Sequence, residues 1–354
     1  MAGSIAIGGS NAWPNNRPTA GAPEAALDFE HAQPISMPLP PVVRPTRAID
    51  EGGSLAAPAR TQRQMTWDSF RAHRMAFISL CVLGMIVTTC VLLPFVLVKP
   101  DAIDYKLLAA TGPSAHHPFG TDTLGRDVMS RLINAGRTSL LIGFMVAIAS
   151  AAVGSSVGVT AGYFGGKIDA ALMWFVNVLM TIPSLPLLTA MAVLVANPDS
   201  KVGFIFGKLP QVWRIIFVFV ALGWLGISRV VRSQVLSLRD QEFCEAARAL
   251  GASHQRVMFL HILPNTVSVI AVFTTLAVSG AIIGESALSF LGFGVQPPSA
   301  TWGNMLNDAR DLNTILNYWW LTWFPALAIC VTVLSVNFIG DGVRDALDPK
   351  SMKK

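Results

Sequence analysis

Six segments of this chain are almost free of charged residues, and each is long enough, or nearly long enough, to cross a lipid bilayer. A membrane-spanning helix needs about 20 consecutive apolar residues. The predicted spans are Met75–Val98, Thr138–Gly166, Ala170–Ala196, Ile215–Ser228, Ile262–Gly284 and Leu312–Gly340. Inside a bilayer every backbone polar group must be paired within the protein, which favours helices. The pattern therefore predicts an all-α membrane protein with six transmembrane helices.

The composition agrees with this class, because only 13% of the 354 residues are charged, against about 25% in soluble domains. Six spans place both termini on one side. Most Lys and Arg residues then fall in the N-terminal tail, the segment 229–256 and the C-terminal tail. Such basic segments stay in the cytoplasm. We therefore expect both termini and the loop 229–264 to be cytoplasmic. No Lys/Arg run is dense enough to predict nucleic-acid binding.

The first 64 residues differ from the rest, because they are rich in proline, alanine and glycine and carry balanced charge. Such a segment cannot bury enough apolar surface to fold. We predict a disordered cytoplasmic tail over 1–64 and a transmembrane domain over 65–350, with an external segment over 99–137. An alternative is that Met65 is the true start. No cysteine falls in a predicted external loop, so no structural disulfide is expected.

The loop 229–264 is the one long charged interruption in the hydrophobic half of the chain. Its stretch Leu236–Leu250 has helical periodicity, with an apolar stripe at Phe243, Ala247 and Leu250. Gly251 can adopt the left-handed conformation that ends a helix, and Pro264 suits the first turn of the next span. The pattern predicts a short, slim helix that enters a groove on a partner in water. An amphipathic helix lying on the lipid surface is the alternative.

Two spans carry features that shape helix packing. Gly154, Gly158 and Gly162 recur at intervals of four and let a neighbouring helix approach closely. They fit either packing within the chain or a contact with another subunit. Pro183 and Pro186 remove backbone donors and bend the third span.

Catalytic motifs are missing or out of context. The chain has no P-loop sequence, so it is not expected to bind ATP itself. The G-x-S-x-G string at 154–158 lies inside a predicted span instead of at a strand-to-helix elbow. His116 and His117 could hold a metal, but solvated loop histidines fit better because no other ligand has suitable spacing. Glu285 is costly at membrane depth, and both a functional and an interfacial role fit it.

Several motifs together resemble one family of membrane proteins. The segment with Glu245-Ala246-Ala247, Gly251 and Leu263-Pro264 resembles the EAA loop of ABC importer membrane subunits. The wider set comprises His117–Asp122, Gly125–Asp127, Ser130–Leu132, Ala161–Gly166, Leu288–Gly292, Gln296–Pro298, Trp302–Gly303, Asn337–Asp341 and Arg344–Pro349. This set resembles the C-type permease subunit of the dipeptide/oligopeptide transport family. The segment Asn197–Trp213 is longer than usual there and predicts an extra external turn.

The resemblance implies a type I importer permease fold in the bacterial inner membrane. The partners would be a homologous second permease subunit, two ATPase subunits or domains and an extracytoplasmic substrate-binding protein. ATP and Mg²⁺ would sit on the ATPases, so this chain would bind no cofactor and hold no catalytic residue. The implied ATPase-coupling residues are Glu242, Glu245, Ala246, Ala247, Gly251 and Pro264. The implied external-face residues are Asp122, Arg126, Asp127 and Trp302.

Other functions compete with peptide import. The same architecture carries nickel chelates, glutathione, opines and other small solutes in relatives of this family. A secondary carrier would need ion-coupling residues within its spans and repeated halves, and the sequence has few of the former and no visible repeat. A membrane enzyme would need a nucleophile and a base, which the motifs do not supply.

Overall fold

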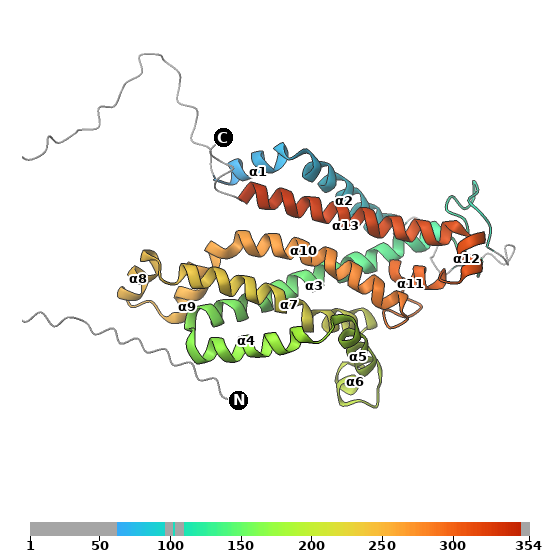
Figure 1. Ribbon diagram of the computed structural model, residues 1–354. Helices are drawn as coiled ribbons and strands as arrows, with labels where there is room; N and C mark the ends of the chain where they lie inside the picture. The colour runs from blue at the N-terminus through green and yellow to red at the C-terminus, as the bar shows by residue number, and fades with distance from the viewer. Residues whose placement is uncertain (1–61, 96–101, 103–109, 348–354) are drawn as a thin grey trace, which may run out of the picture. The chain divides into compact units, whose positions relative to one another are not determined.

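A computed structural model of the chain describes residues 62–95, 102 and 110–347 (Figure 1). The predicted tail lies outside these residues apart from its last three positions. So do residues 96–98 of the first predicted span, residues 99–101 and 103–109 of the predicted external segment and the C-terminal residues 348–354. Over the described residues the chain is helical, and its only β contact there is an isolated bridge between Thr121 and Asp127. The predicted all-α fold is confirmed.

Five helices in the described part of the chain are long and apolar enough to cross a membrane. They are α2 (Arg74–Leu92, extended by the short turn Leu93–Phe95), α3 (Val128–Phe164), α7 (Gln211–Leu238), α10 (Leu263–Phe290) and α13 (Trp319–Leu347). The helices α4 (Gly166–Thr181) and α5 (Ser184–Ala196) make a sixth crossing if the pair counts as one broken span.

The third predicted span, Ala170–Ala196, is broken instead of merely bent. Its two halves, α4 and α5, meet at 94°. Ile182 at the junction is extended, with φ −82° and ψ 129°. A proline ring disfavours the helical conformation of the residue before it, so Pro183 explains why the helix stops there.

The fourth predicted span was too short. α7 extends well beyond Ile215–Ser228 and includes Arg214 and Arg229, the two arginines that flank this segment in the sequence. Arg229 donates to Asn177 of α4 at 2.8 Å, and Arg232 of α7 forms an ion pair with Asp169 of α4. A charge on a span is tolerated when it faces protein partners, which is why the helix can continue through these positions.

Two other predicted boundaries also move. α3 begins at Val128, before the predicted Thr138, because Asp127 caps it by accepting a hydrogen bond from the Ser130 amide. The predicted span Leu312–Gly340 contains two helices, α12 (Leu312–Asn317) and α13. They are separated at Tyr318, whose φ of −127° and ψ of 55° are not helical.

The spanning helices pack mainly around α3, which lies against α7 and α10, while α13 lies against α10 and α2 (Figure 1). The α3–α7 contact is unusually close. A Cβ atom built on Gly154, Gly158 or Gly162 would lie 2.8, 2.6 or 2.9 Å from a backbone carbonyl oxygen of α7. The glycine face therefore serves packing within the chain.

Short helices occupy the two ends of this bundle. α8 (Glu242–Ala249) and α9 (His254–Arg256) lie at one end, here called the loop end (Figure 1). α11 (Trp302–Asp308) and α12 lie at the other, here called the far end. α1 (Gln62–Ala72) packs against α13, and α6 (Lys201–Phe206) fills the predicted extra turn. A π-helical segment, Val257–Ile262, leads into α10.

Candidate functional site

The first candidate site is α8, which connects α7 to the segment before α10. The sequence predicted one helix over Leu236–Leu250, but the chain forms two. α7 ends at Leu238, a turn follows, and α8 begins at Glu242. Glu242 and Glu245 are both exposed in the first turn of α8, where negative charge is favoured by the helix dipole.

The end of α8 follows the sequence prediction closely. Gly251 has a φ of +80°, in the left-handed region. Its amide donates to the Arg248 carbonyl at 2.9 Å, and the Ala252 amide donates to the Ala247 carbonyl at 3.0 Å. These bonds close the helix in the manner typical of a glycine-terminated end. Pro264 lies in the first turn of α10, as predicted.

The face of α8 that packs on the molecule differs from the predicted apolar stripe. Cys244 is fully buried and packs with Ala247 against Val257 and Ile262 of the π-helical segment. Phe243 and Leu250, two of the three predicted stripe residues, are exposed, and Leu250 is 88% exposed. The contact with the π-helical segment turns Cys244 and Ala247 inward, so Phe243 and Leu250 of the predicted stripe remain on the open side of the helix. Burial raises the pKa of the Cys244 thiol, and the nearby Arg248 partly opposes this shift.

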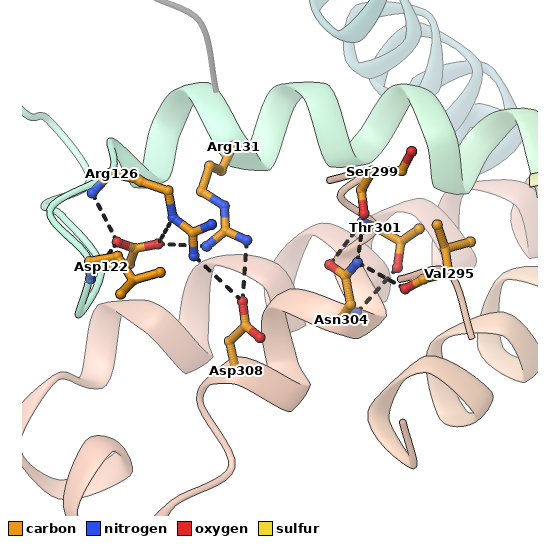
Figure 2. A network of polar contacts seen from close by, with 9 residues as sticks. Asp122, Arg126, Arg131, Val295, Ser299, Thr301, Asn304 and Asp308 are labelled. Atoms are coloured by element: carbon orange, nitrogen blue, oxygen red, sulfur yellow. Dashed lines mark hydrogen bonds and ion pairs between the residues drawn. The ribbon is translucent and has the colours of Figure 1, made fainter. Parts of the chain in front are cut away.

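The second candidate site is a charged network at the far end. Asp122 accepts from Arg126 Nε at 2.7 Å and from Arg131 Nη1 at 2.6 Å (Figure 2). Arg131 Nη2 donates to Asp308 at 3.2 Å, and Arg126 Nη2 lies 4.0 Å from the same carboxylate. The network thus joins the segment before α3, α3 itself and α11.

Two members of this network, Asp122 and Arg126, are predicted as external-face residues from the family motifs. Arg131 lies in one of these motifs but is not predicted as a site residue, and Asp308 is not predicted at all. Asp308 is far from the others in sequence, and no local pattern marks it. Three members of the network, Arg126, Arg131 and Asp308, line a pocket of about 560 Å³ together with polar residues of the 289–307 region. The lining polar residues are Ser289, Gln296, Ser299, Asn304 and Asn307.

The other two predicted external-face residues have structural contacts. Asp127 caps α3 and also binds His117 Nδ1 at 3.0 Å. Trp302 is 1% exposed, and its indole nitrogen donates to the Leu132 carbonyl at 3.0 Å. The Trp302 side chain therefore packs in the core and not on an outer surface, because it anchors the start of α11 against α3.

Glu285 lies in the interior of the bundle and not at an interface. It is fully buried, and its carboxylate accepts from Ser289 Oγ at 2.6 Å and from Ser139 Oγ at 3.4 Å. Ser139 Oγ also accepts from the Trp302 amide at 3.1 Å. Glu285 thus takes part in the joint between α3, α10 and α11.

The metal and nucleophile candidates are placed as follows. No group of three or more His, Cys, Asp and Glu side chains with ligand geometry occurs among the residues that the structure describes. In the G-x-S-x-G string, Ser156 is exposed on α3 and donates to the Ala152 carbonyl at 2.8 Å. This is the geometry of a helical serine and not of a strand-to-helix elbow.

Known proteins match most of the chain. Residues 154–353 match the family described as "Binding-protein-dependent transport system inner membrane component", and residues 61–113 match the "N-terminal TM domain of oligopeptide transport permease C". The dipeptide transport system permease protein DppC of Bacillus subtilis is 38% identical over 303 residues, which cover 85% of this chain and 89% of that protein. The oligopeptide transport system permease protein OppC of Haemophilus influenzae is 37% identical over 286 residues, covering 79% and 86%.

A third relative, the oligopeptide transport system permease protein OppC of Mycobacterium bovis, is 34% identical over 292 residues, which cover 82% of this chain and 96% of that protein. The matches and the apolar helices together identify a multi-pass inner-membrane protein. The chain therefore belongs to the family of binding-protein-dependent transport system inner membrane components, within its dipeptide/oligopeptide permease group.

Proposed function

We propose that this chain is a membrane-spanning subunit of an ATP-driven peptide importer and that a partner ATPase docks on α8. The observation that carries this proposal is the form of α8. It is a short helix at the loop end, held between two spanning helices and turned outward with Glu242, Glu245 and Leu250 exposed.

The outer face of α8 has the chemistry of a contact surface. Ala246 and Ala249 are exposed and keep the helix slim, so it can enter a groove. Leu250 and Phe243 present apolar side chains beside two carboxylates. Burying a leucine side chain contributes about 1.5–3 kcal/mol, so a partner that covers Leu250 gains affinity there, while a basic partner residue can pair with Glu245.

The remaining partners follow from the same assignment. The distribution of Lys and Arg in the sequence supports a cytoplasmic position for the loop end and both termini, on the side where ATP is available. A second permease subunit completes the translocation path, and the far end faces the extracytoplasmic binding protein. The ATPases hold ATP and Mg²⁺, and this chain performs no catalysis. The relatives named dipeptide and oligopeptide permeases support a peptide as cargo.

The test is purification of the tagged chain from its native membrane in mild detergent, followed by mass spectrometry. We expect a second permease subunit and P-loop ATPases with the unaltered chain, and a loss of ATPases of about tenfold for Glu245→Lys. Asp199→Lys is the matched control, because Asp199 is an exposed acidic residue outside α8, and it should retain the ATPases. A lone chain that moves solute in liposomes without ATP would refute the proposal.

A further inference from the structure

The end of α3 that reaches the loop end carries a tyrosine that the proposed docking function does not use. Tyr163 is nearly buried, at 9% exposed. Its hydroxyl lies 2.9 Å from His254 Nδ1 of α9. The guanidinium carbon of Arg248, from α8, lies 5.5 Å from the centre of the Tyr163 ring. One side chain of α3 therefore contacts both short helices of the loop.

A second series of contacts also connects Arg248 to the end of α3. Arg248 also donates from Nη2 to the Arg239 carbonyl at 2.7 Å. Arg239 in turn donates from Nη1 to the Gly162 carbonyl at 3.1 Å. Arg248 thus reaches the end of α3 both through the Tyr163 ring and through Arg239. We call the set Tyr163, Arg239, Arg248 and His254 the clamp.

The clamp adds to the packing of Cys244 and Ala247 against the π-helical segment. α8 is flanked by the turn after Leu238 on one side and by Gly251 on the other. Without the clamp, a push on α8 would reach the bundle through these two connections and through the packing of Cys244 on the π-helical segment. The clamp adds polar and ring contacts that fix α8 and α9 to α3.

The element that receives the push is itself rigidly joined to the bundle. Beyond the clamp, α3 is packed against α7 along its glycine face, where no side chain could fit between the backbones. Such close packing has low compressibility and transmits strain. A displacement of α8 that reaches Tyr163 is therefore passed to α3 and α7 together.

We propose that Tyr163, held by Arg248 and His254, is a positioning residue that passes displacement of α8 directly into α3. This inference rests on the proposed docking of an ATPase on α8. It adds a polar route to the two covalent connections through α7 and α10 and to the apolar packing of Cys244. It also gives a role to the segment Ala161–Gly166. Tyr163 lies in the last turn of α3, and the chain then turns at Gly165 and Gly166.

The test measures the distance between two spin labels in the purified complex. One label is placed at Gln255→Cys in α9 and the other at Ser156→Cys in α3, both exposed positions. The exposed cysteines Cys81 and Cys330 are replaced by alanine. Pulsed EPR then compares the nucleotide-free complex with the complex trapped by ATP and vanadate.

In the otherwise unaltered chain we expect the same mean distance in both nucleotide states, because the loop and α3 move together. In Tyr163→Ala the mean distance should shift when ATP is trapped, because the loop follows the ATPase and α3 does not. Tyr163→Phe, which keeps the ring beneath Arg248, should give a smaller shift. Tyr318→Phe is the matched control at the far end and should show none.

A nucleotide-dependent shift in the unaltered chain, or none in Tyr163→Ala, would overturn the inference. A merely structural role predicts a distribution that broadens equally in both nucleotide states. His254→Gln gives a second variant at an exposed position if Tyr163→Ala is not recovered from membranes, and it should also produce the shift. Failure of the proposed function is seen separately, as a purified chain that brings no ATPase with it.

Discussion

Asp122 holds together the charged network at the far end. Its carboxylate accepts from the Leu124 and Arg126 amides, both at 2.9 Å, in addition to the two arginine side chains. Arg131 is only 7% exposed, so it depends on this partner for much of its charge compensation. Removing one member of a buried ion pair leaves an uncompensated charge and costs about 3–5 kcal/mol.

We therefore expect Asp122→Ala to lower the thermal midpoint of the detergent-solubilised chain markedly. The measurement is the fraction of monodisperse protein that remains after heating, followed by size exclusion. Asp199→Ala is the control, because Asp199 is exposed and surface charges contribute little. An unchanged midpoint for Asp122→Ala would mean that Asp308 alone compensates Arg131.

Cys244 gives a second prediction at the level of one residue. Its thiol is buried and its pKa is raised, so it ionises above the ordinary cysteine value of about 8.5. The neutral thiol favours the folded loop. This stability is present below the pKa of the thiol in the unfolded chain, and it is lost as the pH rises through the pKa of the thiol in the folded chain.

For Cys244 we expect slow maleimide labelling at neutral pH and faster labelling only in alkaline solution. Ala249→Cys, on the exposed side of α8, should label rapidly throughout, and equal rates would contradict the burial of Cys244.

At the level of elements, the close approach of α3 and α7 depends on glycine. A Cβ atom at position 158 would lie 2.6 Å from the Ser228 carbonyl oxygen, a backbone atom that cannot rotate away. We expect Gly158→Ala to destabilise the folded chain by about 1–3 kcal/mol. Gly226→Ala is the control, because nothing lies within 4 Å of a Cβ atom there and alanine favours helix by about 1 kcal/mol over glycine. Equal thermal midpoints for the two variants would show that α3 and α7 can separate freely.

The same elements show what the sequence can predict. The apolar segments predicted every spanning helix in the described part of the chain. The length of a segment and its lack of charged residues can be read directly from the sequence. The extent of α7 was missed because its arginines are paired with Asp169 and Asn177, which come from another helix. The prolines predicted a bend in the third span but not its 94° size. Likewise Gly251 marked the end of α8, whereas no glycine or proline marks the turn before it.

At the scale of the whole molecule, α3 links the two candidate sites. It has 37 residues, which corresponds to about 55 Å at 1.5 Å per residue. Arg131 of the far-end network lies near its start and Tyr163 of the clamp lies near its end. No sequence pattern could have shown this connection, because Asp308 and His254 reach α3 only through the folded chain. A single helix thus touches both the surface proposed for the binding protein and the surface proposed for the ATPase.

This arrangement predicts that the two ends can be separated by mutation. Asp308 is half exposed, so Asp308→Ala should cost little stability while freeing Arg131 Nη2 from α11. We expect this variant to keep its ATPases. The increase in ATP hydrolysis caused by the loaded binding protein should fall by about fivefold or more, because coupling between linked sites is typically of that size. Glu245→Lys should show the opposite pattern, with the ATPases lost and the far end intact. Both are measured on complexes purified from native membranes, with Asp199→Ala as the control. Full stimulation in Asp308→Ala would mean that the contact between α11 and α3 carries no signal, and that the far-end network only stabilises the fold.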